Sequence, residues 1–153
     1  MRLMTRESIY AAVFAFWSGL TVGGSPAFKT ATRSAKVWEN VAAEDQPALL
    51  QLQRSESVTK PRGLPAKWTL SLDLYLYVHT NQINDPATTA SQLLNPLMDA
   101  IESALTIDDL SNDACTLGGL VSHCYIDGAV QTFEGNLGDE AVMIVPVTIV
   151  VPT

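Results

Sequence analysis

Few side chains in this chain have the types and the spacing that catalysis requires. Ser122 and His123, together with a later acidic residue, supply the groups of a nucleophile, a base and an orienting carboxylate. They are neighbours in a segment that we expect to be a strand, where successive side chains point to opposite faces. The sequence also has no G-x-S-x-G turn, the motif that exposes such a serine. We therefore interpret the pair as structural and expect the protein not to be an enzyme.

Residue types that bind metals are present as well, but their spacing matches no zinc motif. The acidic stretch at residues 108–113 lacks the ligand spacing of an EF-hand loop. No lysine follows the paired glycines in the place that a phosphate-binding loop requires. We predict that the protein uses no metal and no cofactor. The candidate ligands, for which we expect structural or surface roles, are His79, Cys115, His123, Cys124 and Asp127.

The chain contains two cysteines, Cys115 and Cys124. Their spacing leaves a disulfide open, but a disulfide-stabilised scaffold would use more cysteines in a shorter chain. We expect both thiols to be reduced, and we expect Cys124 to lie inside a strand as a small buried apolar residue.

Charge is divided between the two parts of the chain. All nine basic side chains lie at or before Lys67, whereas eleven of the sixteen acidic side chains follow it, and the formal net charge is −7. The acidic part therefore finds cations only in the first part of the same chain or in another copy. Either both parts interleave in one sheet and neutralise each other, or copies associate through oppositely charged surfaces. The acidic balance argues against nucleic-acid binding through phosphate contacts.

Length and composition indicate one folded domain, residues 1–153. Hydrophobic residues make up 47% of the chain, which supplies a core and excludes disorder over its whole length. Charged residues make up only 16%, below the usual share of about 25%. So few charges favour a protein whose surface is buried by partners. No apolar run reaches the roughly 18 residues of a membrane-spanning helix, so we expect no membrane association.

Hydrophobic periodicity predicts an α+β fold. A helix is expected at residues 5–18 with Thr5 as its N-cap. A second is expected at residues 90–105, where Asn95 and Pro96 would divide or kink it. This pattern predicts a single mixed, mainly antiparallel sheet with two amphipathic helices packed on one face. Strands are expected at residues 28–37, 48–52, 68–79, 120–127 and 140–151.

Two parts of this arrangement are candidate partner contacts. Residues 54–66 are rich in proline and glycine and are expected to form a long exposed loop. In this loop Arg54, Lys60 and Arg62 would contact a partner. The last strand is apolar on both faces and contains Pro146, which favours a sheet edge that another subunit covers. Its predicted subunit-interface residues are Met143, Val145, Val147 and Ile149.

A set of segments, spread over nearly the whole chain, carries a resemblance to a known family. The segments are T-R-E-S-I-Y-A-A-V-F from Thr5, P-A-L-L from Pro47, W-T-L-S-L-D-L-Y-L-Y-V from Trp68, L-L-N-P-L-M-D-A-I from Leu93, T-L-G-G-L-V-S-H-C-Y-I-D-G from Thr116 and A-V-M-I-V-P-V-T-I-V from Ala141. In this order they resemble the tail terminator (tail completion) proteins of long-tailed bacteriophages, of the minor tail protein U type.

The resemblance implies a structural virion protein that forms a homo-oligomeric ring of six subunits. Such a ring would sit on the finished tail tube protein, stop tube growth and offer the surface that joins the head-tail connector or neck protein. DNA would pass through its channel without specific binding, and the ring would assemble in the bacterial host cytoplasm. Residues 54–66 would then make an axial contact with the tube or the neck. The resemblance assigns no residue a catalytic or binding role.

Other interpretations stay open on the sequence. Another ring protein of the phage neck, or the tail tube protein itself, would share the low charge content and the apolar last strand. A secreted small binding module would fit if residues 1–27 formed a signal peptide, because Arg2 and Arg6 precede an apolar run. Against a signal peptide, Glu7 separates these charges from the run, and no A-x-A cleavage site follows.

Overall fold

The fold is organised around β5 (Lys67–His79), the long strand with alternating polar and apolar residues. The computed structural model describes residues 5–36, 41–80, 87–137 and 139–152. Every second side chain of β5 from Leu70 to Leu76 is fully buried. Because side chains alternate between the two faces of a strand, the leucines all face one way and form the centre of the core.

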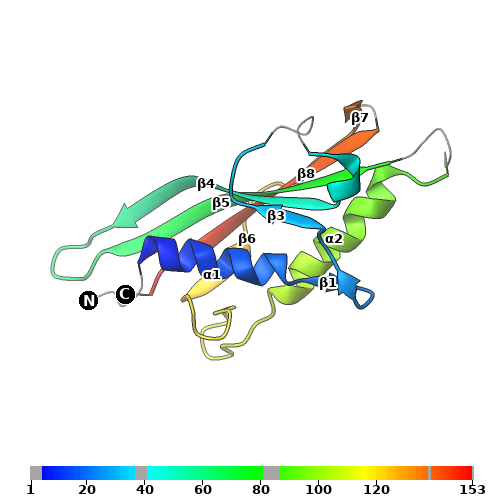
Figure 1. The fold of residues 1–153 in the computed structure, drawn as a ribbon. Coiled ribbons are helices and arrows are strands. Elements are labelled where there is room, and N and C mark those ends of the chain that lie inside the picture. Colours follow the sequence, from blue (N-terminus) through cyan, green and yellow to red (C-terminus); the bar gives the residue numbers. More distant parts are fainter. Residues whose placement is uncertain (1–4, 37–40, 81–86, 138, 153) are drawn as a thin grey trace.

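The remaining elements surround β5 as Figure 1 shows. Both helices lie on one face of the sheet, so the chain is an α+β protein. Besides a short 3₁₀ helix at Ala43–Asp45, the elements are α1 (Arg6–Ser18), β1 (Thr21–Val22), β2 (Ser25–Pro26), β3 (Thr30–Thr32), β4 (Ala48–Thr59), α2 (Ala90–Ala104), β6 (His123–Ile126), β7 (Gln131–Leu137) and β8 (Glu140–Val150).

The main sheet has the strand order β3-β4-β5-β8-β6, and β7 also pairs with β8. β3 and β4 run parallel, whereas the other pairs in this sheet are antiparallel. β1 and β2 form a separate two-stranded hairpin. The predicted fold class, a mixed and mainly antiparallel sheet with two helices on one face, is therefore confirmed.

The core lies between this sheet and the two helices. α1 contributes Ile9, Tyr10, Val13 and Trp17 to it, all at most 1% exposed. α1 is thus part of the core. A smaller apolar cluster covers part of the opposite face. There Tyr77 is buried, and its hydroxyl donates a hydrogen bond of 3.0 Å to the carbonyl of Lys36.

The helix boundaries follow from their caps. The Thr5 hydroxyl accepts a hydrogen bond of 3.1 Å from the Ser8 N–H, which confirms the predicted N-cap of α1. α2 starts after a capping box between Thr89 and Gln92. It then continues through Pro96, so the predicted division at that residue is wrong. Buried apolar side chains on both sides of Pro96 hold the helix together despite a proline cost of about 3 kcal/mol.

The last strand is not at an edge of the sheet, so the predicted subunit interface along β8 is wrong. β8 pairs with β5 on one side and with β6 and β7 on the other. Along β8, the stretch paired with β7 ends at Ile144, and the stretch paired with β6 begins at Val147. Pro146 lies in the gap between these two stretches. Asp73 of β5 stands opposite Pro146 on one side, but no residue of β6 or β7 is in register with it on the other, so a missing N–H is tolerated on that side. The four residues assigned to the interface are 0–5% exposed inside their own subunit: Met143, Val145, Val147 and Ile149.

Three strand boundaries also differ from prediction. Residues 28–37 form a strand only at Thr30–Thr32, with residues 37–40 outside the described part. β6 begins at His123 instead of residue 120. β7 was expected to be a loop, because Gly128, Gly135 and Gly138 are spread through that segment. β4 runs on to Thr59, so residues 54–59 of the loop predicted at residues 54–66 are strand, and only residues 60–66 connect β4 to β5.

Candidate subunit-contact site

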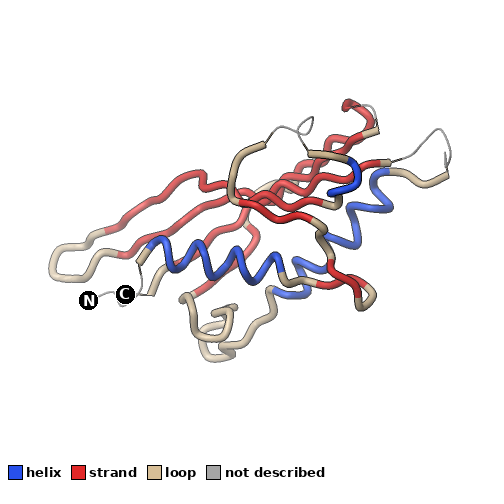
Figure 2. Tube along the Cα trace, in the orientation of Figure 1, coloured by secondary structure: helices blue, strands red, loops and turns tan. Residues whose placement is uncertain are grey.

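A hairpin projects from the body of the protein. β4 and β5 pair as far as Thr59 and Lys67, whereas β8 pairs with β5 only as far as Thr69. β3 covers β4 only at its first three residues. Residues 53–65 are all exposed, and the end of the hairpin extends beyond the rest of the sheet (Figures 1 and 2). We call residues 58–67 the hairpin tip.

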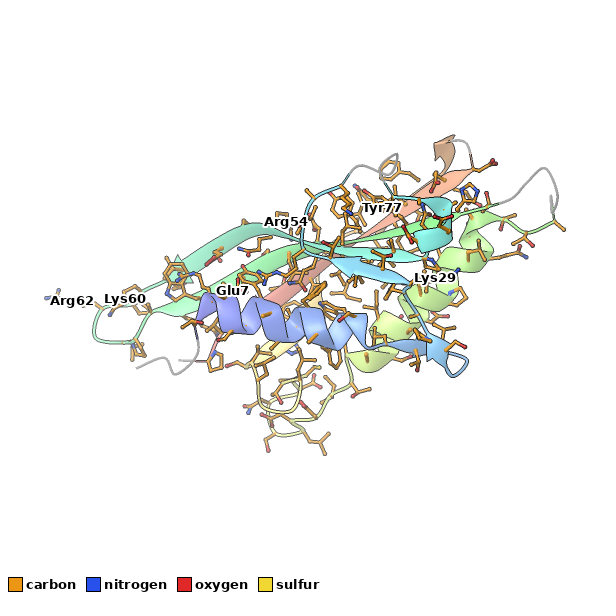
Figure 3. All side chains as sticks on the ribbon, viewed as in Figure 1. Glu7, Lys29, Arg54, Lys60, Arg62 and Tyr77 are labelled. Carbon is orange, nitrogen blue, oxygen red and sulfur yellow. The ribbon has the colours of Figure 1, made fainter. Side chains whose placement is uncertain are left out.

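The hairpin tip is basic. Lys60 and Arg62 lie at its end (Figure 3), and Lys67 begins β5. The ammonium group of Lys60 donates a hydrogen bond to the carbonyl of Leu64, which closes the turn. Within the described part of the chain, these three cations have no ion-pair partner among the acidic side chains. The tip therefore offers positive charge to whatever approaches it.

Arg54 does not belong to this group. It lies within β4, and Figure 3 shows it over the middle of the sheet, away from Lys60 and Arg62. Its guanidinium Nε lies 3.5 Å from an Asp73 carboxylate oxygen on β5. The structure thus brings together two of the three predicted contact residues and assigns the third to a cross-strand ion pair.

Apolar side chains stand among the tip cations. Val58 is 49% exposed and Leu64 is 58% exposed. The turn that presents Leu64 is closed by a 3.1 Å hydrogen bond from its N–H to the Pro61 carbonyl. Gly63 has φ +81°, a conformation that a glycine adopts at little cost. Exposed aliphatic side chains on an ordered turn are typical of a contact surface.

An acidic loop lies between α2 and β6. The Asp108 carboxylate accepts hydrogen bonds from the Thr116 N–H at 2.6 Å, the Thr116 hydroxyl at 2.9 Å and the Gly118 N–H at 2.9 Å. The loop is further closed by backbone hydrogen bonds between Asp109 and Ala114. Leu110, at its outer end, is 86% exposed. The loop is therefore an ordered structure with an apolar side chain among carboxylates.

The hydrogen bonds to Asp108 are expected to depend on pH. They hold the pKa of this carboxyl below its ordinary value of 3.8, first through the Thr116 N–H and then through the Gly118 N–H. A lowered pKa means that the contacts are fully present above the ordinary value and are lost as the pH falls through the lowered one. In an NMR titration, the amide shifts of Thr116 and Gly118 are expected to change together below pH 3.8.

The Asp108→Asn variant is the control for this titration. It removes the ionisable group, so the shared transition of the two amides should disappear. A transition that persists in this variant, or one centred above the ordinary value of an aspartate, would contradict the assignment.

A pocket of about 350 Å³ opens between this loop, the end of α2 and β6. Its walls are mostly apolar, and Glu102 is exposed on α2 among its lining residues. The remaining lining residues are Met98, Leu105, Ile107, Cys115, His123, Cys124, Tyr125 and Ile126. We call this the α2–β6 pocket.

The two cysteines at the base of the pocket are free and buried. Cys124 is fully buried within β6, as predicted, and burial raises the pKa of its thiol to about 12. Burial also raises the pKa of Cys115. Both thiols are therefore protonated at neutral pH, when they are weak nucleophiles and weak metal ligands.

The Ser122–His123 pair, which we interpret from the sequence as structural, lies at the start of β6. The His123 Nδ1 accepts a hydrogen bond of 3.0 Å from the Cys115 N–H, and the ring stacks on Tyr125 with 4.5 Å between centroids. This hydrogen bond ties the backbone at Cys115 to the first residue of β6. His79 is the last residue of β5, and its Nδ1 lies 3.0 Å from a carboxylate oxygen of Glu140, the first residue of β8. Within the described residues, no three histidine, cysteine or acidic side chains come together as metal ligands would.

Folding does little to neutralise the acidic part of the chain. Among the described residues, one ion pair, Arg54–Asp73, joins a lysine or arginine to an acid that follows Lys67. Carboxylates of the acidic part instead accept hydrogen bonds from neutral groups, as Glu134 does from Ser91. Among the described residues, ion pairs within the subunit therefore neutralise little of the acidic part. The other arginine pairs stay within the basic part: Arg6–Glu56 and Arg33–Glu7.

None of the helices in the described part of the chain combines the length and the apolar character needed to span a bilayer. A comparison with models of known protein families finds no match to this chain, and a comparison with curated proteins finds none either.

Proposed function

We propose that this protein is a structural subunit that associates with copies of itself into a ring, and that the ring ends a phage tail tube and joins it to the head. The observation that supports self-association is that the basic and the acidic side chains remain on separate parts of the folded chain. A basic hairpin tip and an acidic loop lie on separate parts of one subunit, and among the described residues neither forms an ion pair. Separate complementary surfaces produce head-to-tail contacts, which form a ring when the rotation between copies closes.

The terminator role comes from the resemblance of the sequence segments to tail terminator proteins. The fold supports this role in one respect, since the chain is an α+β subunit with one sheet and two helices. No catalytic step is part of the proposal. An acidic surface facing the ring channel would repel DNA phosphates and let DNA pass without binding it.

Electron microscopy of particles assembled without this protein tests the terminator role. Overlong tails are the expected result, because nothing would then stop the growth of the tube. Tails of normal length without heads would instead assign the protein to the neck. Unchanged particles would contradict both assignments.

Charge reversal at the hairpin tip tests the contact site. The double variant Lys60→Glu plus Arg62→Glu is expected to abolish most head-tail joining, since it reverses two exposed cations that have no partner in their own subunit. Both side chains are exposed, so the body of the fold should be unaffected, although the variant also removes the Lys60–Leu64 hydrogen bond across the turn. The measurement is infectivity in a complementation assay, with circular dichroism as the check on folding.

The matched control is Lys29→Glu plus Lys36→Glu. Both lysines are exposed, and the change in net charge is the same, but Figure 3 shows Lys29 far from the tip. This control should keep near-normal infectivity. Equal losses in the two double variants would mean that net charge matters and the hairpin tip does not.

A further inference from the structure

The α2–β6 pocket is large enough and apolar enough to hold the exposed leucine of the hairpin tip. The pocket, of about 350 Å³, is lined mostly by aliphatic and aromatic side chains such as Met98, Leu105 and Ile126. A cavity of about 150 Å³ already accommodates a benzene molecule, so this pocket has room for a leucine side chain. Leu64 is such a side chain, and it projects from the ordered turn at the end of the hairpin with 58% of its surface exposed.

Their charges are complementary as well. Lys60 and Arg62 flank Leu64 in the hairpin tip, and neither has an acidic partner among the described residues. Glu102 lines the pocket, and Asp109 lies on the loop that forms one of its walls. These carboxylates have no lysine or arginine partner in the described part of the chain either. An apolar side chain surrounded by cations thus matches an apolar pocket surrounded by acids.

The two surfaces cannot meet within one subunit. The hairpin strands are paired continuously from Thr59 and Lys67 back into the sheet, so the tip is held in one direction. In Figure 1 the tip lies at one end of the molecule, while α2 and β6 lie under the sheet. A tip that is fixed away from its matching pocket can only enter the pocket of another copy. Such a contact joins different surfaces of two subunits and is therefore head-to-tail.

We propose that Leu64 of one copy inserts into the α2–β6 pocket of the next copy, with Lys60 and Arg62 facing Glu102 and Asp109. The inference rests on the proposed self-association and names the two surfaces that form it. It differs from the axial contact expected from the sequence, because it assigns the hairpin to a neighbouring subunit instead of the tube or the neck. Leu64 would be the buried anchor of the interface, and the charges would form its rim.

The test compares the native mass of three forms in sedimentation equilibrium at low and at high salt: wild type, Leu64→Asp and Leu64→Met. Wild type is expected to form a closed oligomer that weakens as salt rises. Leu64→Asp should weaken association by about 30-fold or more, as substitution of an interface anchor does. Leu64→Met should keep the oligomer, because it conserves an apolar side chain of similar size. At a protein concentration low enough to keep every form monomeric, the unfolding midpoint of each variant should match wild type, since Leu64 is exposed in the single subunit.

Charge reversal at the rim tests the orientation of the contact. Arg62→Glu and Glu102→Arg should each weaken association, and the double variant in one chain should recover most of it, because each rim contact would again join opposite charges. A double variant as weak as the sum of both single changes would overturn this pairing.

The outcomes separate this inference from the proposed function. If Leu64→Asp keeps the wild-type mass, the insertion is overturned while self-association stands. If the Leu64→Asp variant keeps this mass but fails in head-tail joining, the hairpin contacts the tube or the neck. If wild type stays monomeric at both salt concentrations, the insertion and the proposed self-association are both overturned, and the tail lengths of particles lacking the protein decide the terminator role.

Discussion

Replacing Trp17 by alanine is expected to destabilise the protein by about 3–5 kcal/mol, the range for a large aromatic residue removed from a core. Trp17 is fully buried on α1 and belongs to the main cluster beneath the sheet. Its ring packs edge-to-face on Phe16 with 5.2 Å between centroids. The loss is a large part of the roughly 5–15 kcal/mol that stabilises a typical domain. Urea unfolding, followed by circular dichroism, measures it.

Trp17→Phe is the matched control. Within the described residues the indole N–H of Trp17 has no hydrogen-bond partner. Phenylalanine keeps an aromatic ring and removes this buried donor, so the cost should be well under half that of alanine. If the two variants were equally destabilised, ring packing would not be the main contribution. If Trp17→Ala were as stable as wild type, α1 would not belong to the core.

The sequence predicts the parts of this fold in which local patterns and burial agree. β5 alternates over its whole length, and its leucines are buried as the pattern requires. α1 has an N-cap at Thr5 and an apolar face that the core covers. For these elements the local signal also determines which side faces the core, so the α+β class follows from the sequence.

The position of β8 could not be predicted in the same way. The neighbours of a strand depend on long-range pairing, and the apolar run from Val142 to Val150 fits either an edge covered by a partner or a fully buried strand. Pro146 appeared to favour the edge. Its place opposite the gap between β6 and β7 becomes visible only once β7 is recognised as a strand.

In the candidate site, too, some features could be predicted from the sequence and others could not. The exposure of Lys60 and Arg62 was predictable from the proline- and glycine-rich turn. The extension of β4 to Thr59 was not, because its polar half carries no apolar pattern and depends on pairing with β5, which is distant information in the sequence. The α2–β6 pocket was missed altogether. It is built from three segments that are distant in the sequence, and the exposed Leu110 and Leu64 were the available signals that an apolar contact surface exists.

The second large effect concerns β8, where Ile149→Ala is expected to cost about 2–5 kcal/mol of unfolding free energy. Ile149 is fully buried and lies between Leu70 on β5 and Cys124 on β6. Removing its side chain leaves a cavity in a region that paired strands hold in place, so little relaxation is available. A residue at an interface between copies would behave differently. Its truncation would weaken association and leave the stability of the monomer nearly unchanged.

Ile144→Ala separates these two cases, because it makes the same chemical change on the same strand. Ile144 is only partly buried and packs against the smaller cluster on the opposite face. Its loss should therefore cost clearly less than that of Ile149. Urea unfolding at a low protein concentration, where association does not contribute, gives both values. If Ile149→Ala left the unfolding curve unchanged but reduced the native mass, β8 would be a contact between subunits after all. The contact through the hairpin tip would then not be needed to explain the association.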